Sequence, residues 1–245
     1  LEDAREYNII GCVEPQKAGK TDGWHDAAFF NMCRPLELVF SNGMDKGELV
    51  GIQTGDVTRM TTFEEFFDAY KKQMEYCISL MVNADNAIDV AHAERVPLPY
   101  ESCMVDDCIS RGLCVQEGGA VYNFTGPQGF GIANMADSLY AIRKLVYEDK
   151  KVSMEEYKQA LAWNYDKGLD QQSVSDMTEM ILKGMQDAGM AINTDTAKAV
   201  LQTVMRLKPS EEQVSRFTEI HHMIDEVPKY GNAIDDVDYF ARDVA

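Results

Sequence analysis

The sequence predicts an α/β fold with a high helical share, and three observations support this fold class. A short apolar run at residues 7–10 ends at a glycine and is typical of a buried strand. A helical pattern over residues 63–93 follows a capping box at residues 62–65. Strand, loop and helix signals alternate with long connections between them, which is the order expected of an α/β chain.

The first strand leads into a segment that carries a thiol and a carboxylate. Gly11 ends the apolar run, and Pro15 has no N–H to donate, so the strand should not resume there. Cys12 and Glu14 are therefore predicted on a loop, where an i, i+2 spacing in extended backbone points both side chains to one side. Because this loop follows an apolar strand and has no clustered Lys or Arg, we expect Cys12 to be buried.

The elements that follow are predicted from glycines, prolines and helical periodicity. Residues 17–23 form a glycine-bounded loop, and residues 26–40 form a partly helical segment kinked at Pro35. The helix over residues 63–93 carries one apolar stripe, which any packed helix needs. That stripe consists of Phe66, Phe67, Tyr70, Met74, Cys77, Ile78, Met81 and Ile88.

The second half of the chain begins with a glycine-rich segment and continues with helices. Residues 118–131 hold five glycines in fourteen positions, which predicts a loop of tight turns. Helices are predicted over residues 134–149 and after the caps at Ser153 and Ser210. Residues 168–215 are predicted to be surface helices. Breaks in them are expected at Gly184, Gly189 and Pro209.

Composition argues against several classes of function. The formal net charge is −18 over 245 residues, which disfavours a nucleic acid backbone or an anionic membrane as partner. No apolar run approaches the ~18 residues of a membrane span.

The six cysteines form no Cys-x-x-Cys and no common zinc or iron–sulfur spacing, so they are predicted to be reduced thiols. His92 is predicted to pack or cap its helix, and His221 with His222 cannot share one helix face.

Two interpretations of Cys12 follow from the residues alone. One is a buried structural cysteine beside a solvated glutamate, since a free cysteine usually acts as a small apolar side chain. The other is a Cys/His/Asp hydrolase that uses His25 and Asp26. A carboxylate at Glu14 opposes formation of the thiolate that such a hydrolase needs.

Residues 11–16, Gly-Cys-Val-Glu-Pro-Gln, and residues 19–31, Gly-Lys-Thr-Asp-Gly-Trp-His-Asp-Ala-Ala-Phe-Phe-Asn, resemble the cysteine loop of the glycyl radical enzymes, the pyruvate formate-lyase family. The resemblance is closest to the dehydratase branch that acts on glycerol and 1,2-propanediol. Pyruvate formate-lyase itself has two adjacent cysteines at this place, where this chain has only Cys12. The match covers nearly the whole chain and continues through residues 91–95 (Ala-His-Ala-Glu-Arg), 118–129 (Gly-Gly-Ala-Val-Tyr-Asn-Phe-Thr-Gly-Pro-Gln-Gly) and 228–232 (Pro-Lys-Tyr-Gly-Asn).

The resemblance implies a fragment of the family's β/α barrel, helix-rich and with the cysteine loop at the barrel centre. All 245 residues would then belong to one barrel domain. Residues 1–60 would form the cysteine loop and the following helix, residues 61–167 the helices and the glycine-rich pocket loop, and residues 168–245 the outer helices. The family's radical-bearing glycine, in an Arg-Val-x-Gly-Tyr context, does not occur in this sequence, so we expect a piece of a longer polypeptide.

The resemblance further implies a lyase that eliminates water from a small diol, such as glycerol or 1,2-propanediol, through a thiyl radical. In the family's pattern Cys12 carries the thiyl radical and Glu14 is the general base, while Asp26, His25 and Phe130 bind the substrate. A hydroxyproline dehydratase or another eliminating member is the alternative within the family. A non-catalytic scaffold fragment is the alternative from another class.

The same resemblance sets the expected cofactors and partners. No bound cofactor or metal is expected, because the organic radical resides on a glycine outside this chain. The expected partners are a radical S-adenosylmethionine activating enzyme, a small-molecule substrate and, for the full-length protein, a second copy in a homodimer. The expected location is the cytoplasm or a bacterial microcompartment within it. Alone, the chain should be inactive and should leave helix faces at Phe66, Phe67 and Tyr70 uncovered.

Overall fold

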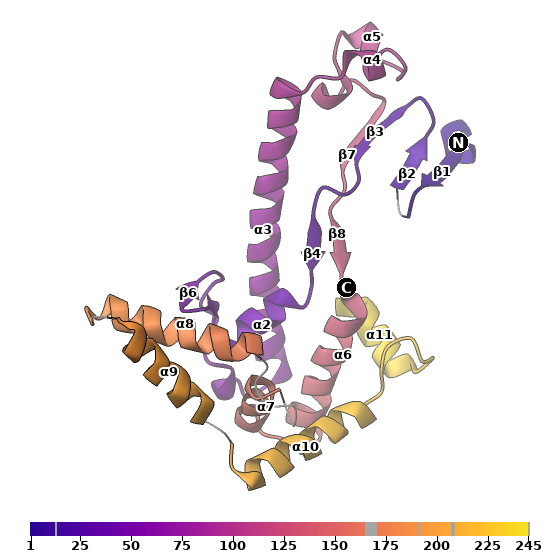
Figure 1. Cartoon of the computed structure of the whole chain (residues 1–245). Helices are drawn as coiled ribbons and strands as arrows, with labels where there is room; N and C mark the ends of the chain where they lie inside the picture. The colour runs from indigo at the N-terminus through magenta and orange to yellow at the C-terminus, as the bar shows by residue number, and fades with distance from the viewer. Residues whose placement is uncertain (13, 165–170, 191, 207–208, 245) are drawn as a thin grey trace. The chain divides into compact units, whose positions relative to one another are not determined.

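The computed structural model describes residues 1–12, 14–164, 171–190, 192–206 and 209–244 (Figure 1). The chain divides into two compact units, each made of two segments. Unit 1 comprises Leu1–Asn31 and Cys77–Phe130, and unit 2 comprises Met32–Tyr76 and Gly131–Ala245. The longest helix, α3 (Phe63–Arg95), contributes residues to both units.

Unit 1 is built on short strands that pair two by two (Figure 1). The antiparallel pair is β1 (Tyr7–Ile10) with β2 (Glu14–Lys17). The parallel pairs are β3 (Thr21–Trp24) with β7 (Tyr122–Thr125), and β4 (Phe29–Asn31) with β8 (Gln128–Phe130). The remaining elements of the unit are α1 (Glu2–Arg5), the end of α3, α4 (Pro99–Ser102), α5 (Cys108–Arg111) and the 3₁₀ helix Val115–Glu117.

Unit 2 is mainly helical and contains the apolar core. Its helices are α2 (Arg34–Phe40), the start of α3, α6 (Ile132–Ile142), α7 (Met154–Ala162), α8 (Gln171–Asp187), α9 (Thr194–Arg206), α10 (Glu211–Glu226) and α11 (Asp235–Val244). It also holds a hairpin of β5 (Met44–Asp45) and β6 (Glu48–Leu49), the 3₁₀ helix Val57–Arg59 and the π-helical segment Arg143–Glu148 that continues α6. Every sheet in the described ranges has two strands, and helices predominate, which confirms the predicted helix-rich α/β class.

The long helix α3 begins at the predicted cap. The N–H of Glu65 donates to Thr62 Oγ1 at 3.2 Å, and the N–H of Thr62 donates to the Glu65 carboxylate at 3.4 Å. The helix spans Phe63–Arg95, which confirms the prediction over residues 63–93. Phe66 and Tyr70 are buried, so the prediction that they lie uncovered is wrong, because the core cluster of unit 2 closes over them.

Gln73 is a polar residue buried within the same core region. Its Nε2 donates to the carbonyl of Ile52, and its Oε1 accepts from the N–H of Ile52 at 3.1 Å. A Cβ at Gly51 would lie 2.6 Å from that Oε1, so a glycine is needed where the loop meets the amide. One side chain therefore satisfies both backbone groups of Ile52, as a neighbouring strand would.

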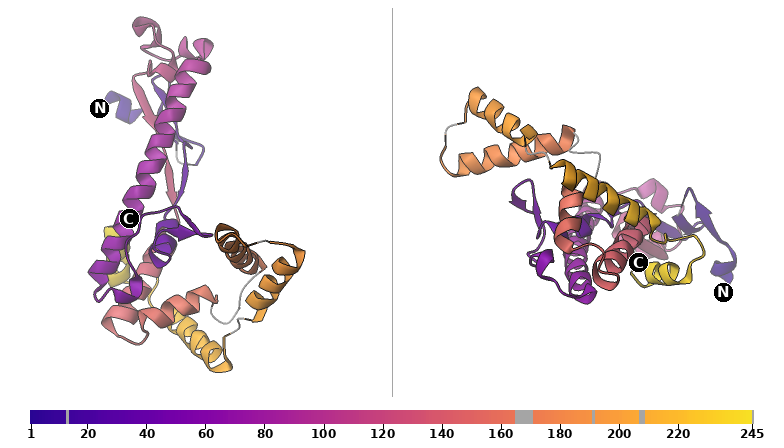
Figure 2. Two further views of the ribbon diagram at one scale, coloured as in Figure 1. Left: turned by 90° about the vertical axis from the view of Figure 1, so that its left-hand side faces the viewer. Right: turned by 90° about the horizontal axis from the view of Figure 1, so that it is seen from below.

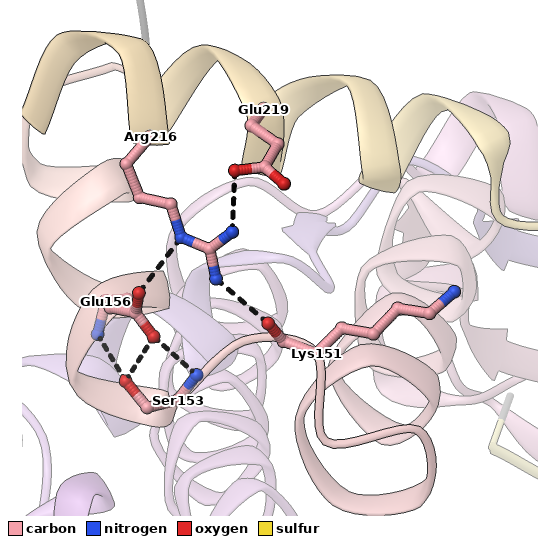
Figure 3. Close-up of polar contacts among 5 residues, drawn as sticks. All are labelled: Lys151, Ser153, Glu156, Arg216 and Glu219. Carbon is pink, nitrogen blue, oxygen red and sulfur yellow. Dashed lines mark hydrogen bonds and ion pairs between the residues drawn. The ribbon is translucent and has the colours of Figure 1, made fainter. Parts of the chain in front are cut away.

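The predicted cap at Ser153 is confirmed, and it joins α7 to α10. The hydroxyl and the backbone N–H of Ser153 both donate to the Glu156 carboxylate, and the Glu156 N–H donates to Ser153 Oγ. Arg216 of α10 donates from Nε to Glu156 Oε1 at 3.0 Å, from Nη1 to Glu219 Oε2 at 2.7 Å and from Nη2 to the carbonyl of Lys151 at 2.9 Å (Figure 3). The bonds that the Glu156 carboxylate accepts from the Ser153 backbone, the Ser153 side chain and Arg216 lower the pKa of Glu156, and the backbone bond has the largest effect.

Two helix predictions need correction. Pro35 lies in the first turn of α2 and begins the helix rather than kinking it, since the first turn needs no N–H from that position. Gly184 lies inside α8, and the helix continues to Asp187 before Gly189 turns the chain with a φ of +77°. The helices α8 and α9 then pack against each other as a helical hairpin (Figure 2).

None of the helices in the described part of the chain is long and apolar enough to cross a bilayer.

Candidate active site

The predicted first strand is present, but its surroundings differ from the prediction. β1 covers residues Tyr7–Ile10 as expected. Its side chains are exposed, with Tyr7 at 54%, Ile9 at 50% and Ile10 at 52%, so the predicted burial is wrong. The reason is that β1 forms a two-stranded hairpin with β2, which pairs one edge and leaves the faces of the strand open.

The backbone reverses directly after this strand. Gly11 has a φ of +65°, Gly11 and Cys12 form the turn, and Glu14 pairs with Ile10 as the first residue of β2. Pro15 thus lies within β2, opposite Ile9, instead of keeping the chain out of a strand. Because the chain turns at Gly11, the extended-backbone argument for Cys12 and Glu14 does not hold. Cys12 is exposed at the turn, so its predicted burial is wrong for this chain.

The carboxyl group of Glu14 lies against the backbone of Gly11. A Cβ built on Gly11 would be 2.5 Å from Glu14 Oε2, 3.0 Å from Cδ and 3.2 Å from Oε1. The side chain of Glu14 is therefore folded back toward the turn that carries Cys12. The structure brings the two residues of the predicted catalytic pair into one hairpin, although by a turn and not by an extended loop.

His25 links the hairpin to the glycine-rich segment. Its Nε2 lies 3.3 Å from the carbonyl oxygen of Pro15, a hydrogen bond that requires the proton on Nε2. Its ring meets Phe124 edge to face, with centroids 4.6 Å apart. A Cβ at Gly23 would lie 2.5 Å from the ring of Phe124 and 2.8 Å from that of His25, so this contact depends on a glycine there. The geometry favours a bracing role for His25 over that of a hydrolase base.

Asp26 and Phe130 are placed by the β4–β8 pair. The Nε2 of Gln128 donates to Asp26 Oδ1, while the backbone N–H of Gln128 donates to the carbonyl of Ala28 at 2.8 Å. β8 thus holds the segment that carries Asp26 at two points. Phe130 pairs with Asn31 across the strands and is 48% exposed.

The glycine-rich segment at residues 118–131 was predicted to be a loop, and this prediction is wrong in part. It contains the strands β7 and β8, each paired in parallel with a strand from the first 31 residues. In the local sequence, the glycines and the proline around and within these short strands outweigh the strand-favouring Tyr122, Phe124 and Thr125. Their partners lie about a hundred positions earlier in the chain, beyond any local pattern.

A cavity of about 440 Å³ in unit 1 is lined by three carboxylates that the sequence did not single out. They are Asp22 on β3, Asp89 on α3 and Glu101 on α4. Burial raises the pKa of Asp22, and the negative charges of Glu101 and Asp89 add to the increase. Asp89 Oδ2 accepts a hydrogen bond from Thr125 Oγ1 at 2.6 Å. These carboxylates lie far apart in sequence, so no local motif could have identified them.

Aromatic side chains complete the wall of this cavity. Trp24 meets His92 edge to face, with centroids 5.3 Å apart, which confirms that His92 packs. No group of three or more His, Cys, Asp or Glu side chains within the described ranges is placed to hold a metal ion. None of the five predicted site residues lines the cavity.

Comparison with known proteins gives three informative matches. The whole chain, residues 1–245, matches the family model described as pyruvate formate lyase-like. A solved structure concerned with 1,2-propanediol dehydration in Roseburia inulinivorans is 60% identical, with a TM-score of 0.94 over 99% of this chain and 29% of that chain. The glycerol-bound B12-independent glycerol dehydratase of Clostridium butyricum is 42% identical, with a TM-score of 0.76 over 99% of this chain and 25% of that chain.

A further protein that is similar to this chain has a named activity. The (2S)-3-sulfopropanediol dehydratase of Klebsiella oxytoca is 41% identical over 167 residues, which is 67% of this chain and 20% of that protein. The chain therefore spans between 20% and 29% of the length of these three proteins.

Proposed function

Because the chain belongs to the pyruvate formate-lyase-like family, we propose that it is part of a glycyl radical dehydratase that removes water from a small diol such as glycerol or 1,2-propanediol. The observation that carries the proposal is the 60% identity and 0.94 TM-score, over 99% of this chain, to a protein studied for 1,2-propanediol dehydration.

The proposed reaction uses the two residues of the hairpin in sequence. The Cys12 thiyl radical takes a hydrogen atom from C1 of the diol, which leaves a carbon radical and the Cys12 thiol. The Glu14 carboxylate takes the proton of the C1 hydroxyl as general base. The C2–O bond then breaks, and the hydroxide accepts a proton and leaves as water. The resulting carbonyl compound carries its radical on C2 and takes the hydrogen atom back from Cys12, so the net products are an aldehyde and water.

The other residues of the site have binding roles in this proposal. Asp26, held by Gln128, accepts a hydrogen bond from a substrate hydroxyl. Phe130 supplies an apolar wall, and His25 braces the hairpin through Pro15. The group that protonates the departing hydroxide belongs to a part of the enzyme outside these 245 residues.

The proposal also covers the complete enzyme. The organic radical is stored on a glycine outside this chain and is generated by a radical S-adenosylmethionine activating enzyme. The three segments 1–60, 61–167 and 168–245 belong to one barrel domain, and the full-length enzyme is a homodimer. The enzyme acts in an anaerobic bacterial cytoplasm or in a microcompartment within it.

The experiment that tests the proposal replaces Glu14 in the activated full-length enzyme. Gln preserves the size of the side chain but cannot take a proton, so Glu14→Gln should lower kcat by about 10²- to 10⁴-fold. The radical yield, measured by electron paramagnetic resonance, should equal that of the parent. Glu2→Gln is the control, because Glu2 is an exposed carboxylate of α1 outside the hairpin.

Substrate identity is tested in the same assay. Aldehyde formation is expected from glycerol or 1,2-propanediol, and not from trans-4-hydroxy-L-proline. Turnover of the proline derivative alone would support the alternative within the family. Full activity of Glu14→Gln would remove Glu14 from the mechanism.

A further inference from the structure

The contact between Glu14 and Gly11 points to a second function for this glycine. Gly11 has a φ of +65°, in the left-handed region that side chains other than Gly and Asn avoid. This backbone conformation alone would account for a glycine at position 11. The carboxyl group of Glu14 adds a separate constraint, because Oε2, Cδ and Oε1 all lie within 3.2 Å of the place that a Cβ would take.

Other glycines of unit 1 show that this crowding is not a general property of turns. Gly112 ends α5 with the same φ of +65°, and a Cβ there would meet nothing within 4 Å. Gly118 has a φ of +75° and is equally open. Backbone strain is therefore common to these positions, whereas the close approach of a carboxylate belongs to Gly11.

We propose that Gly11 is a positioning residue, whose missing side chain leaves the space in which the Glu14 carboxylate is held beside Cys12. A methyl group at Gly11 would lie 2.5 Å from Glu14 Oε2, so the carboxylate would have to move. A misplacement of about 1 Å in a reacting group can cost about 10²-fold in rate. The inference rests on the proposed function, since it gives the position of Glu14 a catalytic consequence.

The two glycines with equal φ provide a matched comparison in the activated full-length enzyme. Gly11→Ala should lower kcat by about 10²-fold with little change in KM and with an unchanged radical yield. Gly112→Ala imposes the same backbone strain without a neighbouring carboxylate, so its kcat should stay close to that of the parent. The acid limb of the pH–rate profile should move in Gly11→Ala and not in Gly112→Ala, because only the first variant changes the surroundings of Glu14.

A second pair of variants separates strain from crowding. Asn tolerates the left-handed region better than Ala, but it still carries a Cβ. Gly11→Asn should therefore fold with less backbone strain than Gly11→Ala. It should still lose activity, because its Cβ displaces the Glu14 carboxylate. Gly112→Asn should be active. Circular dichroism and radical yield verify that the variants are folded and activated.

A double-mutant cycle tests whether Gly11 acts through Glu14. If it does, Gly11→Ala combined with Glu14→Gln should be within about twofold of Glu14→Gln alone. Equal losses in the Gly11 and Gly112 variants, or full additivity in the double variant, would overturn the inference while leaving the proposed function intact. Unimpaired turnover by Glu14→Gln would instead overturn the role of Glu14, and the inference with it.

Discussion

Gln73 shows what a single buried amide contributes to this fold. It lies on α3 among the apolar residues of unit 2 and binds both backbone groups of Ile52. Removing the amide would leave the partly buried N–H and C=O of Ile52 without these bonds. A buried backbone group that loses its partner costs about 1–3 kcal/mol.

Gln73→Leu should therefore lower the free energy of unfolding by about 2–4 kcal/mol. Urea denaturation of the chain, followed by circular dichroism, measures the change. Gln159→Leu is the control, because the side chain of Gln159 donates to Glu155 one turn away on α7, a contact worth about 0.2–0.5 kcal/mol. A loss in Gln73→Leu no larger than in Gln159→Leu would show that Ile52 finds other partners.

At the scale of single residues, the sequence predicts the place of some residues and gives no signal for others. The motif around Cys12 and Glu14 predicts a catalytic pair, since a short motif names residues without knowledge of the fold, and the roles of the two residues stay a prediction. The apolar stripe of α3 predicted that Phe66 and Tyr70 pack in a core, and their burial confirms it, whereas the expectation that the chain alone leaves them uncovered was wrong. Gln73 was missed, because a polar side chain in a helical pattern predicts exposure unless its partner, distant in sequence, is known.

At the scale of elements, the capping boxes at the starts of α7 and α10 offer a natural comparison. The first pairs Ser153 with the ionisable Glu156, and the second pairs Ser210 with the neutral Gln213. The pKa of Glu156 is lowered in the folded state. Its contribution to stability is therefore fully present above the unfolded value of about 4.3, and it is lost as the pH falls through the folded pKa.

Ser153→Ala should cost about 1 kcal/mol of unfolding free energy at pH 7, and this cost should shrink in acid. Ser210→Ala should cost a similar amount at both pH values, because Gln213 does not titrate. Urea denaturation of each variant and of the parent at neutral and acidic pH gives the comparison. Equal pH dependence in the two variants would contradict the assignment of the effect to Glu156.

Elements with local signals were predicted well, and elements that depend on distant partners were not. The caps at Thr62, Ser153 and Ser210 begin helices as expected. The strand at residues 7–10 was also found, because an apolar run that ends in glycine is a local signal. The segment that contains β7 and β8 is predicted from the sequence to be a loop, because these strands form only by pairing with the distant β3 and β4.

At the scale of the whole chain, the two units differ in how much apolar surface they bury. Every residue of the buried core cluster lies in unit 2. In unit 1 the strand β1 is exposed, and the part of α3 that belongs to this unit carries exposed apolar side chains such as Leu80 and Val90, at 49% and 57%. Apolar burial is the main source of stability, so the described residues of unit 1 are stabilised by little apolar burial of their own.

Hydrogen exchange of the isolated chain should reflect this difference. Amides of α6 in unit 2 should be strongly protected, whereas those of β1 and β2 should exchange nearly as fast as in an unfolded chain. Mass spectrometry of peptides from each unit provides the measurement. Comparable protection of β1 and α6 would mean that unit 1 is stabilised by something other than apolar burial.

The two parallel strand pairs also bear on the order in which unit 1 forms. Thr21 pairs with Tyr122 and Phe29 with Gln128, so about a hundred residues must be closed into a loop before either pair exists. Closing such a loop costs about 4 kcal/mol of chain entropy. Contacts with so large a sequence separation slow folding, and helices form first because their bonds are local. The segment with Trp24, His25 and Asp26 is thus among the last parts to reach its native place during synthesis.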